Sequence, residues 1–188
     1  MELREARLDG QTLYRGKIVN VRVDSVALPD GRTATREVVE HPGGVAVVAV
    51  TDAGEVFTVR QYRYPFGEVT REIPAGKLEP GEDPLACALR ELREETGYVC
   101  GRMEPLGVIY ASPGVYTEKL HLYLALDLTF VGQKLDDGEF LHVESTPLQE
   151  LVSQAASNEI KDAKTIIGIM LAQGRIGRPQ REGGRGGA

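Results

Sequence analysis

A short segment between two glycines, Gly76 and Gly97, constrains the fold of this 188-residue chain more than any other part of the sequence. Asp83 followed by Pro84 is a typical helix start, because the aspartate side chain caps the first turn and proline suits the first helical position. Gly97 allows the left-handed conformation that often ends a helix. The sequence therefore predicts a helix from Pro84 to Thr96.

The charged and apolar residues of this predicted helix follow a pattern. Leu85, Leu89 and Leu92 recur at helical spacing and predict a stripe that is buried in the core. Glu91 and Glu95 lie about 40° apart on a helical wheel, beside this stripe. Two like charges so placed repel each other unless a cation lies between them. Mg²⁺ suits the position because it binds a few carboxylates together with substrate phosphate oxygens, whereas an ordinary solvated, charged helix is the alternative.

The same segment resembles the Nudix box, the pattern of glycines and charged residues that marks the Nudix hydrolases. The resemblance holds at every fixed polar and glycine position and at the aliphatic one, namely Gly76, Glu82, Arg90, Glu91, Leu92, Glu94, Glu95 and Gly97. Tyr98 departs from the family pattern, which usually has an aliphatic residue at this packing position. So complete a match argues against an ordinary charged helix.

This resemblance implies an α/β Nudix fold, in which a mixed β-sheet is sandwiched between helices, here with an N-terminal β-strand extension. It further implies that the helix glutamates bind the divalent cations that activate water and clamp a diphosphate. The expected cofactor is Mg²⁺, for which Mn²⁺ can substitute. An enzyme of this kind splits a diphosphate into two monophosphates.

The resemblance also assigns a role to the residues of the box. Glu91 and Glu95 are the principal metal ligands and belong to the catalytic set, which agrees with their positions on the helical wheel. Glu94 contributes to a further metal or to its water shell, although its spacing from Arg90 also fits a surface ion pair. The backbone carbonyl of Ala75 is another metal ligand. The other fixed residues are structural, the charged pair among them holding the loop to the helix: Gly76, Glu82, Arg90 and Gly97.

Residues outside the box resemble those of ADP-ribose pyrophosphatases within the same family. The similar segments lie within residues 12–172 and include residues 35–42, 60–63, 71–76 and 111–114. The resemblance places six residues in substrate binding: Arg36, Arg63, Glu72, Pro113, Gly114 and Glu118. Arg63 suits this role because a planar guanidinium matches phosphate oxygens, and Glu118 could bond a ribose hydroxyl. On residue type alone, the loop at Pro113 equally fits a plain turn and Glu118 an exposed side chain.

The catalytic base is expected outside the box, in the acidic segment of residues 135–140. In the ADP-ribose group of the family, the base comes from such a downstream loop. Glu139 is our candidate, with Asp137 and Asp136 as alternatives, because a base must reach the attacking water. A solvated turn is the competing interpretation of this segment.

These features predict hydrolysis of ADP-ribose to AMP and ribose 5-phosphate, or of a related nucleoside-diphosphate sugar. Another substrate, such as GDP-mannose or a dinucleoside polyphosphate, is the alternative, because the box recognises the diphosphate and not its substituents. A non-catalytic nucleotide-binding module is disfavoured, since such modules usually lose a box glutamate or carry an added DNA-binding domain. This chain has all the box acids, and its length leaves no room for a second domain.

The rest of the chain predicts strands on both sides of the box and helices near the C-terminus. Strands are expected at residues 18–28, 33–39, 45–50, 56–60, 106–110 and 120–128, and helices at residues 147–155 and 163–173. We expect three parts: an N-terminal β extension (residues 1–42), a Nudix domain (residues 43–176) and a disordered Gly/Arg tail (residues 177–188). In the resembling enzymes such an extension exchanges with a partner subunit, so a homodimer is predicted.

Composition bears mainly on partners and location. The net charge of −6 argues against a general binder of nucleic acid or anionic membranes, but not against a small anionic substrate. Cys87 and Cys100 give neither a disulfide framework nor zinc-site spacing. The sequence begins with charged residues and has no apolar run long enough to span a membrane. We therefore expect a cytoplasmic protein without nucleic-acid or membrane partners.

Overall fold

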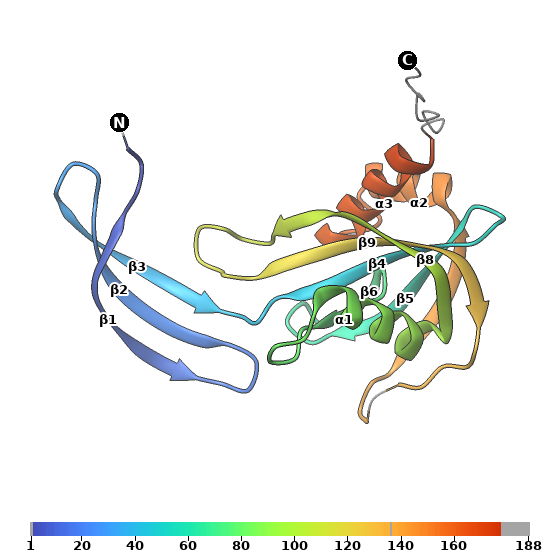
Figure 1. Ribbon diagram of the computed structural model, residues 1–188, viewed down its shortest axis with the longest axis horizontal. Coiled ribbons are helices and arrows are strands. Elements are labelled where there is room, and N and C mark those ends of the chain that lie inside the picture. Colours follow the sequence, from blue (N-terminus) through green and yellow to red (C-terminus); the bar gives the residue numbers. More distant parts are fainter. Residues whose placement is uncertain (1, 136, 178–188) are drawn as a thin grey trace, which may run out of the picture.

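The computed structural model describes residues 2–135 and 137–177, and its strands form two separate sheets (Figure 1). The first sheet is three-stranded and antiparallel, with the order β1 (Ala6–Arg15), β2 (Asn20–Ala27) and β3 (Thr33–Glu40). β2 and β3 are the two predicted N-terminal strands, and the turn that joins them contains Gly31, which has a positive φ of 84°. β1 was not predicted as a strand of its own, because almost all its residues are exposed and no buried face imposes an alternating pattern.

The second sheet contains seven strands in the order β10-β5-β4-β9-β8, with β6 paired to β5 and β7 paired to β4. β4 and β9 run parallel, whereas the other neighbours are antiparallel, so the sheet is mixed. The strands are β4 (Gly44–Val50), β5 (Glu55–Arg63), β6 (Glu68–Glu72), β7 (Ala75–Lys77), β8 (Tyr98–Tyr110), β9 (Lys119–Phe130) and β10 (Leu141–Pro147).

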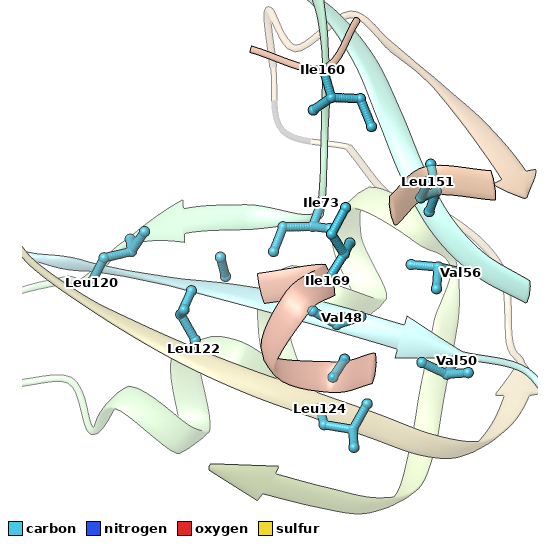
Figure 2. Close-up of a cluster of buried hydrophobic side chains, with 12 residues drawn as sticks. Val48, Val50, Val56, Ile73, Leu120, Leu122, Leu124, Leu151, Ile160 and Ile169 are labelled. Carbon is cyan, nitrogen blue, oxygen red and sulfur yellow. The ribbon is translucent and has the colours of Figure 1, made fainter. Parts of the chain in front are cut away.

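Helices cover both faces of this mixed sheet, and β4 lies between the two cores. Every residue of β4 is buried, as its continuous apolar sequence predicts. Val48 and Val50 pack with Leu151 of α2 (Leu148–Ala156) and Ile169 of α3 (Ala163–Ile176), as Figure 2 shows. Val47 and its neighbours on the other face pack with α1 (Pro84–Glu91). The predicted α/β sandwich with an N-terminal strand extension is therefore confirmed.

The central helix differs from its prediction in two ways. α1 ends at Glu91, and the chain continues to Thr96 as a single π-helical segment that stops at Gly97, whose φ is 80°. The predicted leucine stripe was right for Leu92, which is fully buried, but wrong for Leu85 and Leu89, which are each 41% exposed. The buried face is instead formed by Cys87, Ala88 and Leu92 together with Glu95. Cys87, Ala88 and Leu92 pack in one cluster with residues of β4, whereas Leu85 and Leu89 lie on the outer side of the helix.

The first sheet ends at Glu40 and the second begins at Gly44, so the connection between them is short. No helix within residues 2–135 and 137–177 is long and apolar enough to cross a membrane. The predicted Gly/Arg tail lies, from residue 178 onward, outside the described residues.

Candidate active site

A cleft of about 860 Å³ lies beside the loop that enters α1 and reaches the start of α3 and the turn between β1 and β2. Its size suits a small molecule. Acidic and cationic side chains both line it: Lys17, Arg63, Lys77, Glu79, Arg90, Glu91, Glu95, Glu118, Glu139, Asp162 and Lys164. The walls of the cleft therefore come from segments that are far apart in the sequence, from the turn between β1 and β2 to the start of α3.

Glu95 lies in this cleft on the π-helical segment and is only 3% exposed. Its Oε2 accepts a hydrogen bond from the backbone N–H of Ala75 at 3.0 Å. Burial, together with the negative charges of Glu91 and Glu139, raises the pKa of Glu95 to about 8 against the opposing effect of this hydrogen bond. An ionised Glu95 is thus stabilised by any cation that enters this side of the cleft.

Glu91 lies one helical turn before Glu95 and is held against Gly76. A Cβ atom at position 76 would lie 1.8 Å from Oε1 of Glu91, so only glycine leaves room for this carboxylate. Burial raises the pKa of Glu91, while the charge of Arg90 opposes that shift. The box glycine therefore shapes the acidic wall of the cleft directly.

Arg90 connects the loop to the helix. Its Nε and Nη2 donate to the two carboxylate oxygens of Glu82 at 2.9 and 3.0 Å, and its Nη1 donates to Glu91 at 2.7 Å and to Glu94 at 3.0 Å. The hydrogen bonds from Arg90 hold the pKa of Glu82 at about 2, and the N–H of Glu79 also donates to this carboxylate. Glu82 is therefore ionised at neutral pH and links the loop to α1 through Arg90.

The acidic wall suits a divalent cation chemically, although its side chains have other partners in this structure. Among residues 2–135 and 137–177, no three His, Cys, Asp or Glu side chains form a ready metal-binding group. Glu91 is turned to Arg90 and Glu95 to the N–H of Ala75. Burial and the charges of neighbouring glutamates nevertheless oppose the ionisation of both carboxylates, and a bound divalent cation would relieve both effects.

Arg63 of β5 lies in the cleft and is fixed from behind by Glu72 of β6. Its Nε and Nη2 each donate to one oxygen of Glu72 at 2.6 Å, and Lys164 of α3 forms an ion pair with the same carboxylate. Burial by itself would raise the pKa of Glu72, but the hydrogen bonds from Arg63 and the charge of Lys164 lower it to about 2. Glu72 is 2% exposed and does not itself line the cleft, so it orients two cations that do.

Of the other predicted substrate-binding residues, one lines the cleft and three do not. Glu118 lines the cleft, whereas Pro113 and Gly114 are exposed and are not among its lining residues. Arg36 lies on β3 outside the cleft and donates to Glu5 at 2.9 Å. The structure thus brings Arg63 and Glu118 together, with Glu72 behind Arg63, and leaves the remaining three elsewhere.

The candidate bases and the two further candidate metal ligands also differ in whether they line the cleft. Glu139 is exposed and lines the cleft, whereas Asp137 is exposed outside its lining and Asp136 lies outside the described residues. Ala75 lines the cleft at the start of β7, while Glu94 faces Arg90.

Lys164 and His41 are among the cleft residues that were not predicted from the sequence. Lys164 reaches Glu72 across 92 positions of the chain, and no local pattern marks it as more than a charged residue near a helix start. His41 lies between the two sheets beside Glu118, where a lone histidine gives no sequence signal.

Comparison with known proteins extends these observations over most of the chain. Residues 40–167 match the family model described as NUDIX domain, and residues 5–39 match the nucleoside diphosphate sugar hydrolase N-terminal domain. The chain is 42% identical over 173 residues to the ADP-ribose pyrophosphatase of Bacillus subtilis, with 91% of this chain and 94% of that protein covered. It is 43% identical over 171 residues to the methanol dehydrogenase activator of Bacillus methanolicus, with 90% and 92% covered.

A solved structure shares the fold across nearly the whole length. It is the crystal structure of an ADP compounds hydrolase, with a TM-score of 0.82 and 20% sequence identity over 94% of this chain and 96% of that one. The likeness includes the N-terminal strands as well as the mixed sheet and its helices, because so little of either chain is left uncovered.

Proposed function

The chain belongs to the Nudix hydrolases, and on this premise we propose that it hydrolyses the diphosphate bond of ADP-ribose or of a related nucleoside-diphosphate sugar. The observation that carries the proposal is the pair Glu91 and Glu95, the first partly buried and the second buried, which both line a cleft large enough for a nucleotide sugar. The relative from Bacillus subtilis named ADP-ribose pyrophosphatase supports the choice of substrate.

Nudix hydrolases generally need a divalent metal, and we propose Mg²⁺, with Mn²⁺ able to substitute. Glu91, Glu95 and the carbonyl of Ala75 would hold the ion, with Glu94 at its outer side. Such an ion would supply charge neutralisation at the diphosphate and a more acidic water. Glu95 would then stay ionised in spite of its burial.

The protein's own cations and acids account for the remaining chemistry. Arg63 can donate two parallel hydrogen bonds to phosphate oxygens, and its attachment to Glu72 removes the need to order a flexible side chain. Glu139 is the proposed base, because it lines the cleft from an exposed loop and can take a proton from water. One P–O bond forms to the water oxygen and the bridging P–O bond breaks, which gives AMP and ribose 5-phosphate.

We further propose a homodimer that forms through the N-terminal sheet, in the cytoplasm. Leu8, Leu13 and Tyr14 of β1 are all exposed, and apolar side chains gathered on one strand favour burial against another protein surface. Light scattering at micromolar concentration tests this proposal, and a monomer would overturn it.

A substrate panel with Mg²⁺ and identified products tests the proposed reaction. We expect AMP and ribose 5-phosphate from ADP-ribose, released much faster than the products of GDP-mannose or a dinucleoside polyphosphate. Faster cleavage of either of those compounds would replace the proposed substrate while leaving the reaction class intact. Binding of all these compounds without cleavage would support a nucleotide-binding module instead.

A further inference from the structure

The loop between β8 and β9 is fastened to the end of the N-terminal sheet. The N–H of Val39 donates to the carbonyl of Val115 at 2.7 Å, and the N–H of Thr117 donates to the carbonyl of Val39 at 3.0 Å. Val39 and Tyr116 form an isolated parallel bridge between these hydrogen bonds. Figure 1 shows the loop extending from the larger sheet toward β3. The loop therefore takes its position from a strand that belongs to the other sheet.

His41, one residue beyond β3, adds a second set of contacts. Its N–H donates to Oγ1 of Thr117 at 3.0 Å, and the Thr117 hydroxyl donates to the His41 carbonyl at 3.4 Å. The imidazole is only 5% exposed and packs against the ring of Tyr116 at a centroid distance of 5.3 Å. We refer to the contacts of Val39 and His41 with residues 115–117 as the β3 clasp.

The clasp also places the imidazole of His41 beside the carboxylate of Glu118. The N–H of Gly43 donates to Nδ1 of His41 at 3.1 Å, and burial lowers the pKa of this imidazole, which favours its neutral form. Oε1 of Glu118 lies 3.6 Å from this nitrogen, which is beyond hydrogen-bonding distance. The Glu118 carboxylate, which lines the cleft, therefore keeps its acceptor capacity for a ligand.

We propose that Thr117 and His41 are positioning residues, which hold Glu118 in the cleft as the group that recognises the hydroxyls of the sugar beyond the diphosphate. An ionised carboxylate accepts charge-assisted hydrogen bonds from hydroxyl groups and repels phosphate, so its partner is the uncharged, hydroxyl-bearing part of the substrate. The inference rests on the proposed function. Under this proposal, the end of β3 contributes to substrate recognition by the same chain, because it holds the loop that carries Glu118.

Steady-state kinetics with ADP-ribose and Mg²⁺ test the proposal through a matched pair of variants. Thr117→Val removes the hydroxyl at almost constant shape and should raise KM about fivefold at unchanged kcat, because binding common to the ground and transition states is lost. Thr117→Ser keeps the hydroxyl and should restore the wild-type KM. An ADP alkyl ester without distal hydroxyls should show no difference between the two variants.

A double-mutant cycle decides whether Thr117 acts through Glu118. Glu118→Gln should raise KM by itself, and adding Thr117→Val should raise it no further, since positioning has no value once the positioned group is gone. Independent effects of the two changes, or an unchanged KM in Thr117→Val, would overturn the inference. A wild-type protein that cleaves no nucleoside-diphosphate sugar would overturn the proposed function, and the inference would fall with it.

The His41 side gives a second test that does not depend on the folding of Thr117→Val. His41→Phe keeps the ring against Tyr116 but leaves the N–H of Gly43 without its acceptor, and KM should rise as in Thr117→Val. His41→Asn retains an acceptor near Gly43 and should lie closer to wild type. Equal KM values for both variants and the wild type would contradict the assigned role.

Discussion

Gly76 and Glu91 approach each other so closely that a Cβ atom at position 76 would overlap the Glu91 carboxylate, with 1.8 Å to Oε1 and 1.9 Å to Cδ. The atoms in conflict are the far end of a flexible side chain. A methyl group at position 76 therefore displaces a proposed metal ligand without forcing the backbone apart.

Gly76→Ala should consequently damage activity far more than stability. We expect kcat/KM for ADP-ribose to fall about a hundredfold, the scale of loss when a catalytic group is misplaced by about 1 Å. The melting temperature should change little. Gly174→Ala is a matched control, because nothing lies within 4 Å of a Cβ at that helical position. Full activity in Gly76→Ala would show that the position of Glu91 is unimportant.

Glu95→Gln tests the metal assignment by removing charge at constant shape. The amide oxygen can still accept from the N–H of Ala75, so the fold should be retained. Turnover should fall about a hundredfold or more, since a divalent cation contributes several kcal/mol to the transition state. Isothermal titration should show weaker Mn²⁺ binding than in the wild type.

Glu94→Gln provides the comparison on the same helical segment. Glu94 is bonded to Arg90 and is not among the residues lining the cleft, so its loss should reduce turnover less than the loss of Glu95. A larger effect at Glu94 would reverse the proposed order of the ligands.

Glu139→Gln separates the proposed base from the metal ligands. Removing a general base should lower kcat about a hundredfold or more, while Mn²⁺ affinity stays close to that of the wild type. Asp137→Asn in the same loop is the control, because Asp137 is not among the residues lining the cleft. If Asp137→Asn were the more damaging change, the base would have to be reassigned.

The sequence predicted the parts of this site that are encoded locally. The box lies within one loop and one helical segment, so helical spacing related Glu91 to Glu95, and the resemblance to the Nudix box added Gly76. The buried strand β4 was equally clear, because both of its faces are covered and its residues are uniformly apolar.

Contacts between distant segments could not be predicted in this way. Glu72 meets Lys164 across 92 positions, and Thr117 meets His41 across 76. The leucine stripe failed at Leu85 and Leu89 for a related reason, since the face that packs against β4 carries Cys87, Ala88 and Leu92. Which helix face is buried depends on the partner surface, and periodicity does not describe that surface.

The ion pairs around Glu72 predict a dependence of stability on acid. The folded pKa of Glu72 is lowered from 4.5 to about 2, so its contribution to stability is complete above the unfolded value and is lost as the pH falls from about 4.5 to about 2. A shift of this size corresponds to about 3 kcal/mol at most. The free energy of unfolding in urea, measured at several pH values from about 6 to about 2, should show this loss in the wild type. The loss should be smaller in Glu72→Gln, because glutamine does not titrate. Parallel curves for the two proteins would mean that Arg63 and Lys164 do not stabilise the ionised Glu72.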